Sequence, residues 1–214
     1  MAPVAEQTMT AEDWIAQGRP LLDKARFRSL AEATTQDWAT IIEKNRHKKN
    51  HVLRLCLDPL EMLKEPQPGF QIDRYHHSLQ TATRAWRAGF SGDDEMIAAA
   101  VLHDIGDFFA PHNHGEFAAA ILKAYVRPEV SWTLRFHEMF QGYHCFQYFG
   151  LDRNACDAVR GHRYAATCQR FCDEWDQASF DPSYDTMPLA AFMPALERVL
   201  AKPKRMVYDR IHED

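Results

Sequence analysis

The chain has 214 residues, of which 46% are hydrophobic and 12% aromatic, and its formal net charge at pH 7 is −5. The negative charge argues against a general nucleic-acid binder, and no apolar stretch approaches the length needed to span a bilayer. The chain starts without the basic and apolar regions of a signal peptide, and its five cysteines form no CxxC pair. We therefore expect a cytoplasmic protein with reduced thiols that binds neither nucleic acid nor a membrane.

Helical periodicity dominates the chain, and alternating β-branched segments joined by hairpin turns do not occur. Thr10, followed by Glu12 and Asp13, predicts the start of a first helix. A longer helical region over residues 21–63, broken once, is expected before a proline-containing loop at 64–70.

Six more helical segments are expected after this loop, and Asn113 is a suitable N-cap for the third of them. They cover residues 73–90, 91–106, 113–126, 128–150, 162–177 and 188–201. The pattern predicts an all-α protein with a bundle-like core. We expect one compact domain overall, in which residues 1–60 form a helical extension packed on a core of residues 61–214.

Histidines and aspartates interrupt the apolar faces of these predicted helices, where such groups are costly to bury unless they are paired or bound. In "AAAVLHDIG", the adjacent His103 and Asp104 point about 100° apart on a helix, so they can reach one metal ion and its neighbour, with Asp104 as a bridge. A single histidine on an apolar helix is more often a satisfied core residue, but accumulation on successive helices favours a shared metal site. The candidate ligands are His77, His103, Asp104, His114, His137 and Asp176.

Imidazole and carboxylate ligands together suit the first-row transition metals Fe, Mn, Co, Ni and Zn. Two such ions about 3.5–4 Å apart would neutralise the buried carboxylates and hold a reactive oxygen between them. The sequence therefore predicts a dinuclear metal site in the bundle.

"HHSLQTATRAWRAG" followed by "AAAVLHDIGD" resembles the HD-domain superfamily, which is named for the doublet that appears here as His103-Asp104. The resemblance covers roughly residues 69–200, whereas residues 1–60 match no family. It implies an HD-domain helical bundle with extra N-terminal helices. The superfamily includes metal-dependent phosphohydrolases and a smaller group of mixed-valent diiron oxygenases, typified by myo-inositol oxygenase and the phosphonate-cleaving enzymes.

The resemblance implies that the six candidate ligands hold two metal ions, with Asp104 as the bridging carboxylate. His77 is preferred to His76 because the Ser-Leu-Gln-Thr-Ala stretch runs directly from it, and Asp176 is preferred to Asp173 as the last ligand. Gln141 occupies the position at which the phosphonate oxygenases have a lysine. This difference argues against a phosphonate substrate but does not change the predicted metal ligands.

The function that this resemblance favours is a diiron oxygenase, which uses Fe(II)/Fe(III) and O2 to oxidise or cleave a small hydroxylated, optionally anionic, substrate. The alternative is a phosphohydrolase of a phosphomonoester or nucleotide that uses Mn, Co, Ni or Zn, and a non-catalytic HD-fold binding protein is the third reading. A homodimeric assembly stays open.

Further candidates lie close to these ligands in the sequence. Asp104, Asp107 and Gln141 are the candidate catalytic residues, because Asp107 could assist proton transfer and Gln141 lies one helical turn after His137. Basic groups near the ligands could meet an anionic part of a substrate. The candidate substrate-binding residues are Lys123, Arg135, His144 and Arg163.

Overall fold

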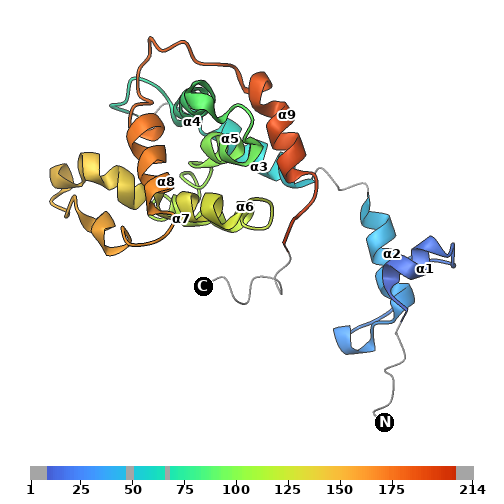
Figure 1. Cartoon of the computed structure of the whole chain (residues 1–214). Helices are drawn as coiled ribbons and strands as arrows, with labels where there is room; N and C mark the ends of the chain where they lie inside the picture. Colours follow the sequence, from blue (N-terminus) through green and yellow to red (C-terminus); the bar gives the residue numbers. More distant parts are fainter. Residues whose placement is uncertain (1–8, 47–50, 66–67, 206–214) are drawn as a thin grey trace. The chain divides into compact units, whose positions relative to one another are not determined.

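The computed structural model describes residues 9–46, 51–65 and 68–205. The chain divides into two compact units, residues 1–49 and 50–214 (Figure 1). Helix α3 (His51–Met62), which we assigned to the N-terminal extension, belongs to the second unit by its contacts with α4 and α9. The described residues contain helices and no strand, as expected for the all-α class.

The first unit contains α1 (Ala11–Ala16), the short 3-10 turn η1 (Leu30–Glu32) and α2 (Thr35–Asn45). Both α-helices begin at a capping box. In each, the threonine side chain accepts the backbone N–H of an aspartate three residues later, and the side chain of that aspartate accepts the backbone N–H of the threonine. The pairs are Thr10 with Asp13 and Thr34 with Asp37. The predicted first helix start at Thr10 is confirmed.

The prediction of a helix from residue 21 is wrong for residues 21–29, which are irregular. Side chains of α2 accept the backbone N–H groups that a helix would use internally. Asp37 Oδ1 accepts from Arg26 N at 2.7 Å, and Thr40 Oγ1 accepts from Leu22 N at 3.0 Å. These bonds hold the segment against α2 in a non-helical path. Residues 47–50 of the same predicted region lie outside the described residues.

The second unit is a helical bundle that follows the predicted segments closely. Two of its helices continue into π-helical turns, a feature that the sequence analysis did not predict. After α3, its elements are α4 (Arg74–Ala85), η3 (Trp86–Phe90), α5 (Asp94–Leu102), α6 (His114–Leu122), α7 (Pro128–Cys145), η4 (Phe146–Phe149), η5 (Ala155–Ala158), α8 (Ala165–Arg170), η6 (Phe171–Asp176) and α9 (Leu189–Leu200).

Helix α5 lies in the middle of this unit and packs against α4, α7 and α9 (Figure 1). Each residue from Met96 to Leu102 is fully buried, so the helix is apolar on all sides. Its three consecutive alanines, Ala98, Ala99 and Ala100, allow neighbouring helices to approach closely. Because α5 ends at Leu102, the next two side chains, His103 and Asp104, emerge inside the bundle and not at its surface.

Glycine is required where α6 approaches its neighbours. A Cβ atom at Gly115 would lie 2.6 Å from the Leu134 carbonyl oxygen and 3.0 Å from His137 Nδ1. A Cβ atom at Gly106 would lie 2.6 Å from the His114 carbonyl oxygen. These contacts are shorter than a side chain tolerates, so the two glycines let the start of α6 sit directly against α7 and the turn after α5.

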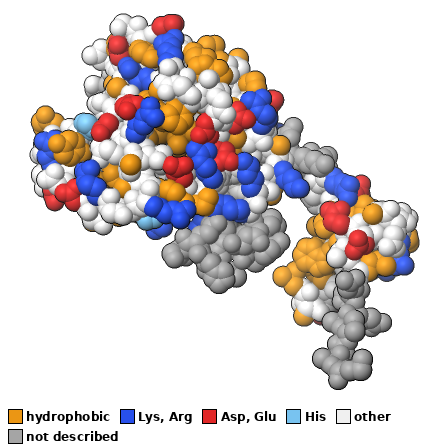
Figure 2. All heavy atoms as spheres, in the orientation of Figure 1, with side chains coloured by type: hydrophobic (Ala, Val, Ile, Leu, Met, Phe, Trp, Pro, Cys, Tyr) orange, Lys and Arg blue, Asp and Glu red, His pale blue; other side chains and the backbone are white. Residues whose placement is uncertain are grey.

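The surface of the second unit mixes both signs of charge, with acidic and basic side chains interspersed over the face that Figure 2 shows. None of the helices among the described residues has the length and apolar character of a membrane span. All five cysteines are free thiols.

We predict that Ala99→Leu destabilises the protein by about 1–3 kcal/mol or more, because the added atoms have no space around the central helix. The exposed Ala166→Leu is the control and should change the free energy of unfolding by no more than about 0.5 kcal/mol. Urea unfolding of both variants measures the difference. Equal stability of the two variants would contradict the close packing of α5.

Candidate metal centre

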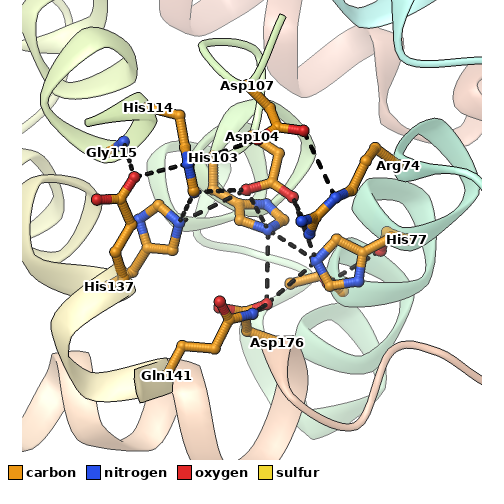
Figure 3. A network of polar contacts seen from close by, with 12 residues as sticks. Arg74, His77, His103, Asp104, Asp107, His114, Gly115, His137, Gln141 and Asp176 are labelled. Carbon is orange, nitrogen blue, oxygen red and sulfur yellow. Dashed lines mark hydrogen bonds and ion pairs between the residues drawn. The ribbon is translucent and has the colours of Figure 1, made fainter. Parts of the chain in front are cut away.

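Six buried ionisable side chains meet in one space of the second unit (Figure 3). They come from five helical elements or their ends, and each is at most 9% exposed. We call this set the six-residue cluster. It consists of His77 on α4, His103 and Asp104 directly after α5, His114 at the start of α6, His137 on α7 and Asp176 at the end of η6.

The backbone fixes the orientation of three imidazole rings. His77 Nδ1 lies 2.8 Å from the Ser179 carbonyl oxygen, His103 Nδ1 lies 3.0 Å from that of Ala100, and His137 Nδ1 lies 2.7 Å from that of Leu134. A carbonyl oxygen can only accept, so each Nδ1 carries the hydrogen and donates it. Each Nε2 is then left with a lone pair when the ring is neutral, and it points into the cluster.

The Nε2 atoms form two close pairs. Those of His77 and His103 are 3.1 Å apart, and those of His114 and His137 are 3.2 Å apart. Two lone pairs cannot face each other at this distance unless a positive charge, a proton or a metal ion, lies between them. Two nitrogen ligands held about 2.1 Å from one ion at a right angle would be separated by about 3 Å, which fits both pairs.

The carboxylate of Asp104 lies between these two pairs. Its Oδ1 is 3.2 Å from His114 Nε2, 3.4 Å from His103 Nε2 and 3.6 Å from His137 Nε2, and its Oδ2 is 3.5 Å from His77 Nε2. The carboxylate therefore contacts both histidine pairs, with Oδ1 close to three of the rings and Oδ2 close to His77. This position is compatible with the predicted bridging role of Asp104, which stays a prediction.

The carboxylate of Asp176 completes the side formed by His77 and His103. Its Oδ1 is 3.1 Å from His77 Nε2 and 3.6 Å from His103 Nε2, and it accepts a hydrogen bond from Gln141 Nε2 at 2.8 Å. Its Oδ2 is buried without a hydrogen-bond partner. A buried carboxylate oxygen without a partner is costly, and a bound cation would relieve that cost.

The alternatives to two cluster members lie elsewhere. Asp173 is three residues before Asp176 on the π-helical turn η6, and it contacts His144 Nε2 at 3.0 Å and Gln169 Nε2 at 2.6 Å, outside the cluster. His76 is largely exposed and contacts Asp73 at the N-cap of α4. The structure brings together the preferred set and not these alternatives.

Two residues that the sequence analysis missed contact the cluster. Arg74 Nη1 is 3.3 Å from Asp104 Oδ2, and Arg74 Nε is 3.6 Å from Asp107. Glu138 Oε1 is 2.6 Å from His114 Nδ1 and accepts the Gly115 N–H at 3.0 Å. Arg74 lies one helical turn before His77, which was a usable signal, whereas Glu138 could be found only from the packing of α6 on α7.

Electrostatic coupling shifts the pKa of several groups in the cluster. Burial alone lowers the pKa of His114, but its contacts with Asp104 and Glu138 outweigh burial and raise the pKa to about 10. Burial likewise opposes ionisation of Asp104 and Asp176, yet interactions with neighbouring side chains hold the pKa of both below the usual range. For Asp104 the main interactions that lower the pKa are electrostatic, with His103 and Arg74, and for Asp176 they are the hydrogen bonds with His103 and His77.

The other predicted site residues divide into two groups. Asp107 lies beside the cluster, 3.7 Å from His114 Nδ1, and Gln141 contacts it through Asp176. The structure does not bring the four predicted substrate-binding residues to the cluster. Lys123 and Arg135 line a separate pocket, His144 pairs with Asp173, and Arg163 contacts the Tyr164 hydroxyl. Asn113 does precede α6 but makes no capping hydrogen bond through its side chain.

The donor set of the cluster fits metal ions. Four imidazole nitrogens converge with two carboxylates, and a second contact orients each imidazole through its other ring nitrogen. Three overlapping groups of three residues, His77/His103/Asp104, His103/His137/Asp176 and Asp104/His114/His137, each have ligand atoms close enough to share an ion. Nitrogen-rich sites of this kind suit transition metals and not Mg²⁺ or Ca²⁺.

We predict that metal-free protein loses the stabilisation due to His114 as the pH rises. A pKa raised from 6.5 to about 10 on folding means that this contribution is fully present below about pH 6.5 and disappears as the pH passes through about 10. The difference in urea stability between wild type and His114→Gln should therefore shrink over this range. The exposed His112→Gln is the control, and a pH-independent difference for His114→Gln would contradict the assignment.

Comparison with curated proteins gave no significant match. The HD domain family matches residues 74–179, a segment that begins at Arg74 on α4 and ends three residues after Asp176. This segment contains all six residues of the cluster, including the adjacent His103 and Asp104. Residues 74–179 are therefore similar to the HD domain, and this match supports the resemblance to the HD-domain superfamily.

Proposed function

We propose that the six-residue cluster holds two transition-metal ions and that the chain is a dinuclear oxygenase, which oxidises a small hydroxylated substrate with O2. The position of Asp104 carries this proposal, because its carboxylate lies within 3.6 Å of the Nε2 atoms of all four histidines and so contacts both histidine pairs. A bridging carboxylate of this kind is needed when two ions lie about 3.5–4 Å apart.

The donor set supports metals that can change oxidation state. Four imidazoles and two carboxylates accommodate Fe(II) and Fe(III) as well as Mn, Co, Ni and Zn. When bound, a pair of iron ions would supply electrons for the activation of O2. The cluster is buried in the bundle, which would keep bulk water from the reaction.

The charges beside the cluster favour an uncharged hydroxylated substrate over a phosphate ester. Arg74 is the only lysine or arginine among the described residues that forms an ion pair with the cluster, and it already contacts Asp104 and Asp107. Two further carboxylates, Asp107 and Glu138, flank His114. They would repel the negative oxygens of a phosphate, which phosphoryl transfer requires the site to stabilise.

Residues around the cluster would act by positioning the ligands. Gln141 donates to Asp176 Oδ1 and so fixes the orientation of that carboxylate. Glu138 contacts His114 Nδ1, which makes the opposite nitrogen a better ligand. Arg74 holds Asp104 Oδ2 in the direction of His77.

A phosphohydrolase is the second candidate, and the position of Asp107 favours it. This carboxylate is only 17% exposed and lies beside the cluster near His114 and Arg74, where it could take a proton from an attacking water. In that case a pair of ions without a redox role would lower the pKa of the water and polarise the phosphoryl oxygen.

We predict that protein loaded anaerobically with iron and partly reduced binds two ions per chain and gives the low-temperature EPR signal of a coupled mixed-valent pair. Asp104→Asn removes the bridging charge while keeping the side-chain size, so the coupled signal should be lost. Asp173→Asn is the matched control, because Asp173 lies three residues from the ligand Asp176 yet outside the cluster. It should retain the signal.

Two irons per wild-type chain without a coupled signal would overturn the diiron oxygenase. Hydrolysis of p-nitrophenyl phosphate by the Mn, Co or Ni form, without O2 uptake, would then support the phosphohydrolase. Retention of the coupled signal in Asp104→Asn would instead contradict the bridging role of Asp104.

We also predict that Gly115→Ala lowers the metal content from two ions to one per chain. The new Cβ would meet the Leu134 carbonyl oxygen at 2.6 Å, so α6 must move away from α7 and separate His114 from His137. Gly161→Ala is the control, since a Cβ there meets nothing within 4 Å. Metal analysis of the two purified variants tests this, and full metal content in Gly115→Ala would be the contrary result.

A further inference from the structure

A pocket of about 340 Å³ lies between α6, α7 and residues 162–164, away from the six-residue cluster. Arg135 faces this pocket while His137, two residues later on α7, faces the cluster. Residues two apart on a helix point in nearly opposite directions. Lys123, at the C-cap of α6, follows His114 by nine residues, which is about two and a half helical turns. Their side chains therefore also lie on opposite faces of the helix. The pocket is therefore a site of its own.

One wall of the pocket is aromatic. The rings of Trp132 and His162 are stacked, with centroids 4.5 Å apart and planes 6° from parallel, and Tyr164 packs edge-on against His162. Trp132 and Tyr164 are half-buried, with Trp132 packed against the core, and His162 is exposed. Flat, partly exposed rings of this kind present a surface on which a planar ligand can stack.

The ring nitrogens of His162 have defined roles. Its Nδ1 accepts a hydrogen bond from the Tyr164 backbone N–H at 3.3 Å. The hydrogen of the neutral ring is therefore on Nε2, which is left as a donor. The aromatic wall thus offers a hydrogen bond as well as a stacking surface.

The charged residues of the pocket favour an anion. Arg135 Nε forms an ion pair with Glu116 at 3.2 Å, so these two charges balance each other. Lys123 also lines the pocket, and its amino group has no ion-pair partner within residues 9–46, 51–65 and 68–205. The described lining residues therefore leave one positive charge unbalanced.

Small side chains form the rest of the lining. Ala119 and Ala120 on α6 and Ser131 on α7 leave room for a ligand between the two helices. Ligand pockets span about 300–1,000 Å³, so this one is at the small end of that range. It suits a molecule of one or two rings and not a peptide or nucleic-acid strand.

We propose that this pocket binds a small molecule that combines a planar aromatic ring system with an anionic group. The ring packs against the aromatic wall formed by Trp132, His162 and Tyr164, and the anionic group pairs with Lys123. Charge and stacking act together, so a ligand that lacks either feature binds more weakly.

Calorimetric titration of the full chain with naphthalene-2-sulfonate tests this proposal. The probe has two fused rings and a sulfonate, and it contains neither a phosphate ester nor a hydroxyl group. It is therefore not a substrate in either candidate reaction, and the result is independent of the proposed function. We expect one site per chain with a Kd below about 1 mM.

Naphthalene-2-sulfonamide, which is uncharged, and cyclohexanesulfonate, which has no aromatic ring, should each bind about tenfold more weakly or worse. Lys123→Gln and His162→Ala should weaken binding of the sulfonate to a similar extent. Lys202→Gln, on the exposed segment after α9, is the charge-matched control and should bind as wild type does.

Failure of the sulfonate to bind below about 1 mM would overturn the proposal. Equal affinity of wild type, Lys123→Gln and His162→Ala would also overturn it, because the probe would then bind elsewhere. Both substituted side chains are at least partly exposed, and circular dichroism identifies any variant that has lost its fold.

Discussion

The buried centre of the second unit needs more positive charge than Arg74 supplies when the four imidazole rings are neutral. Asp104 and Asp176 are ionised and buried, and the Nε2 lone pairs of four histidines point at them and at one another. Burying two ionised carboxylates without any cation nearby would cost more free energy than the whole free energy of unfolding of a typical domain. In the metal-free chain, a proton on His114 supplies part of the positive charge that balances the buried carboxylates. Metal ions can replace them, which couples ion binding to the stability of the bundle.

The rest of the bundle is arranged so that this set can assemble. The alanines of α5 let α4, α7 and α9 pack close around it, and Gly115 lets α6 touch α7 at the same level. Backbone carbonyls of Ala100, Leu134 and Ser179 then fix three rings. The ligand atoms are thus positioned by main-chain geometry, which is less variable than a network made of side chains alone.

Much of this arrangement could be predicted from the sequence, because apolar periodicity marks the helices and the buried polar residues interrupt it at fixed points. The neighbours of a side chain were harder to predict where they depend on how one helix packs against another. Arg135 is near His137 in sequence but on the opposite face of α7, and Glu138 reaches His114 only through the packing of α6 on α7. Residues 21–29 are irregular because side chains of α2 capture their backbone N–H groups. The type of reaction could not be predicted from the ligand residues, because the same ligand set occurs in both oxygenases and hydrolases.

Because the six residues of the cluster are unequally exposed, the two proposed ions would exchange with solution at different rates. The side chain of His114 is 11% exposed, whereas those of the other five are between 0% and 3% exposed. Solvent therefore comes closest to these six residues at His114, so a proposed ion at His114 and His137 would be the outer one and an ion at His77, His103 and Asp176 the inner one. With the outer position filled, the inner ion would leave the cluster more slowly. Its exchange with ions in solution would be governed by opening of the bundle and not by its own affinity.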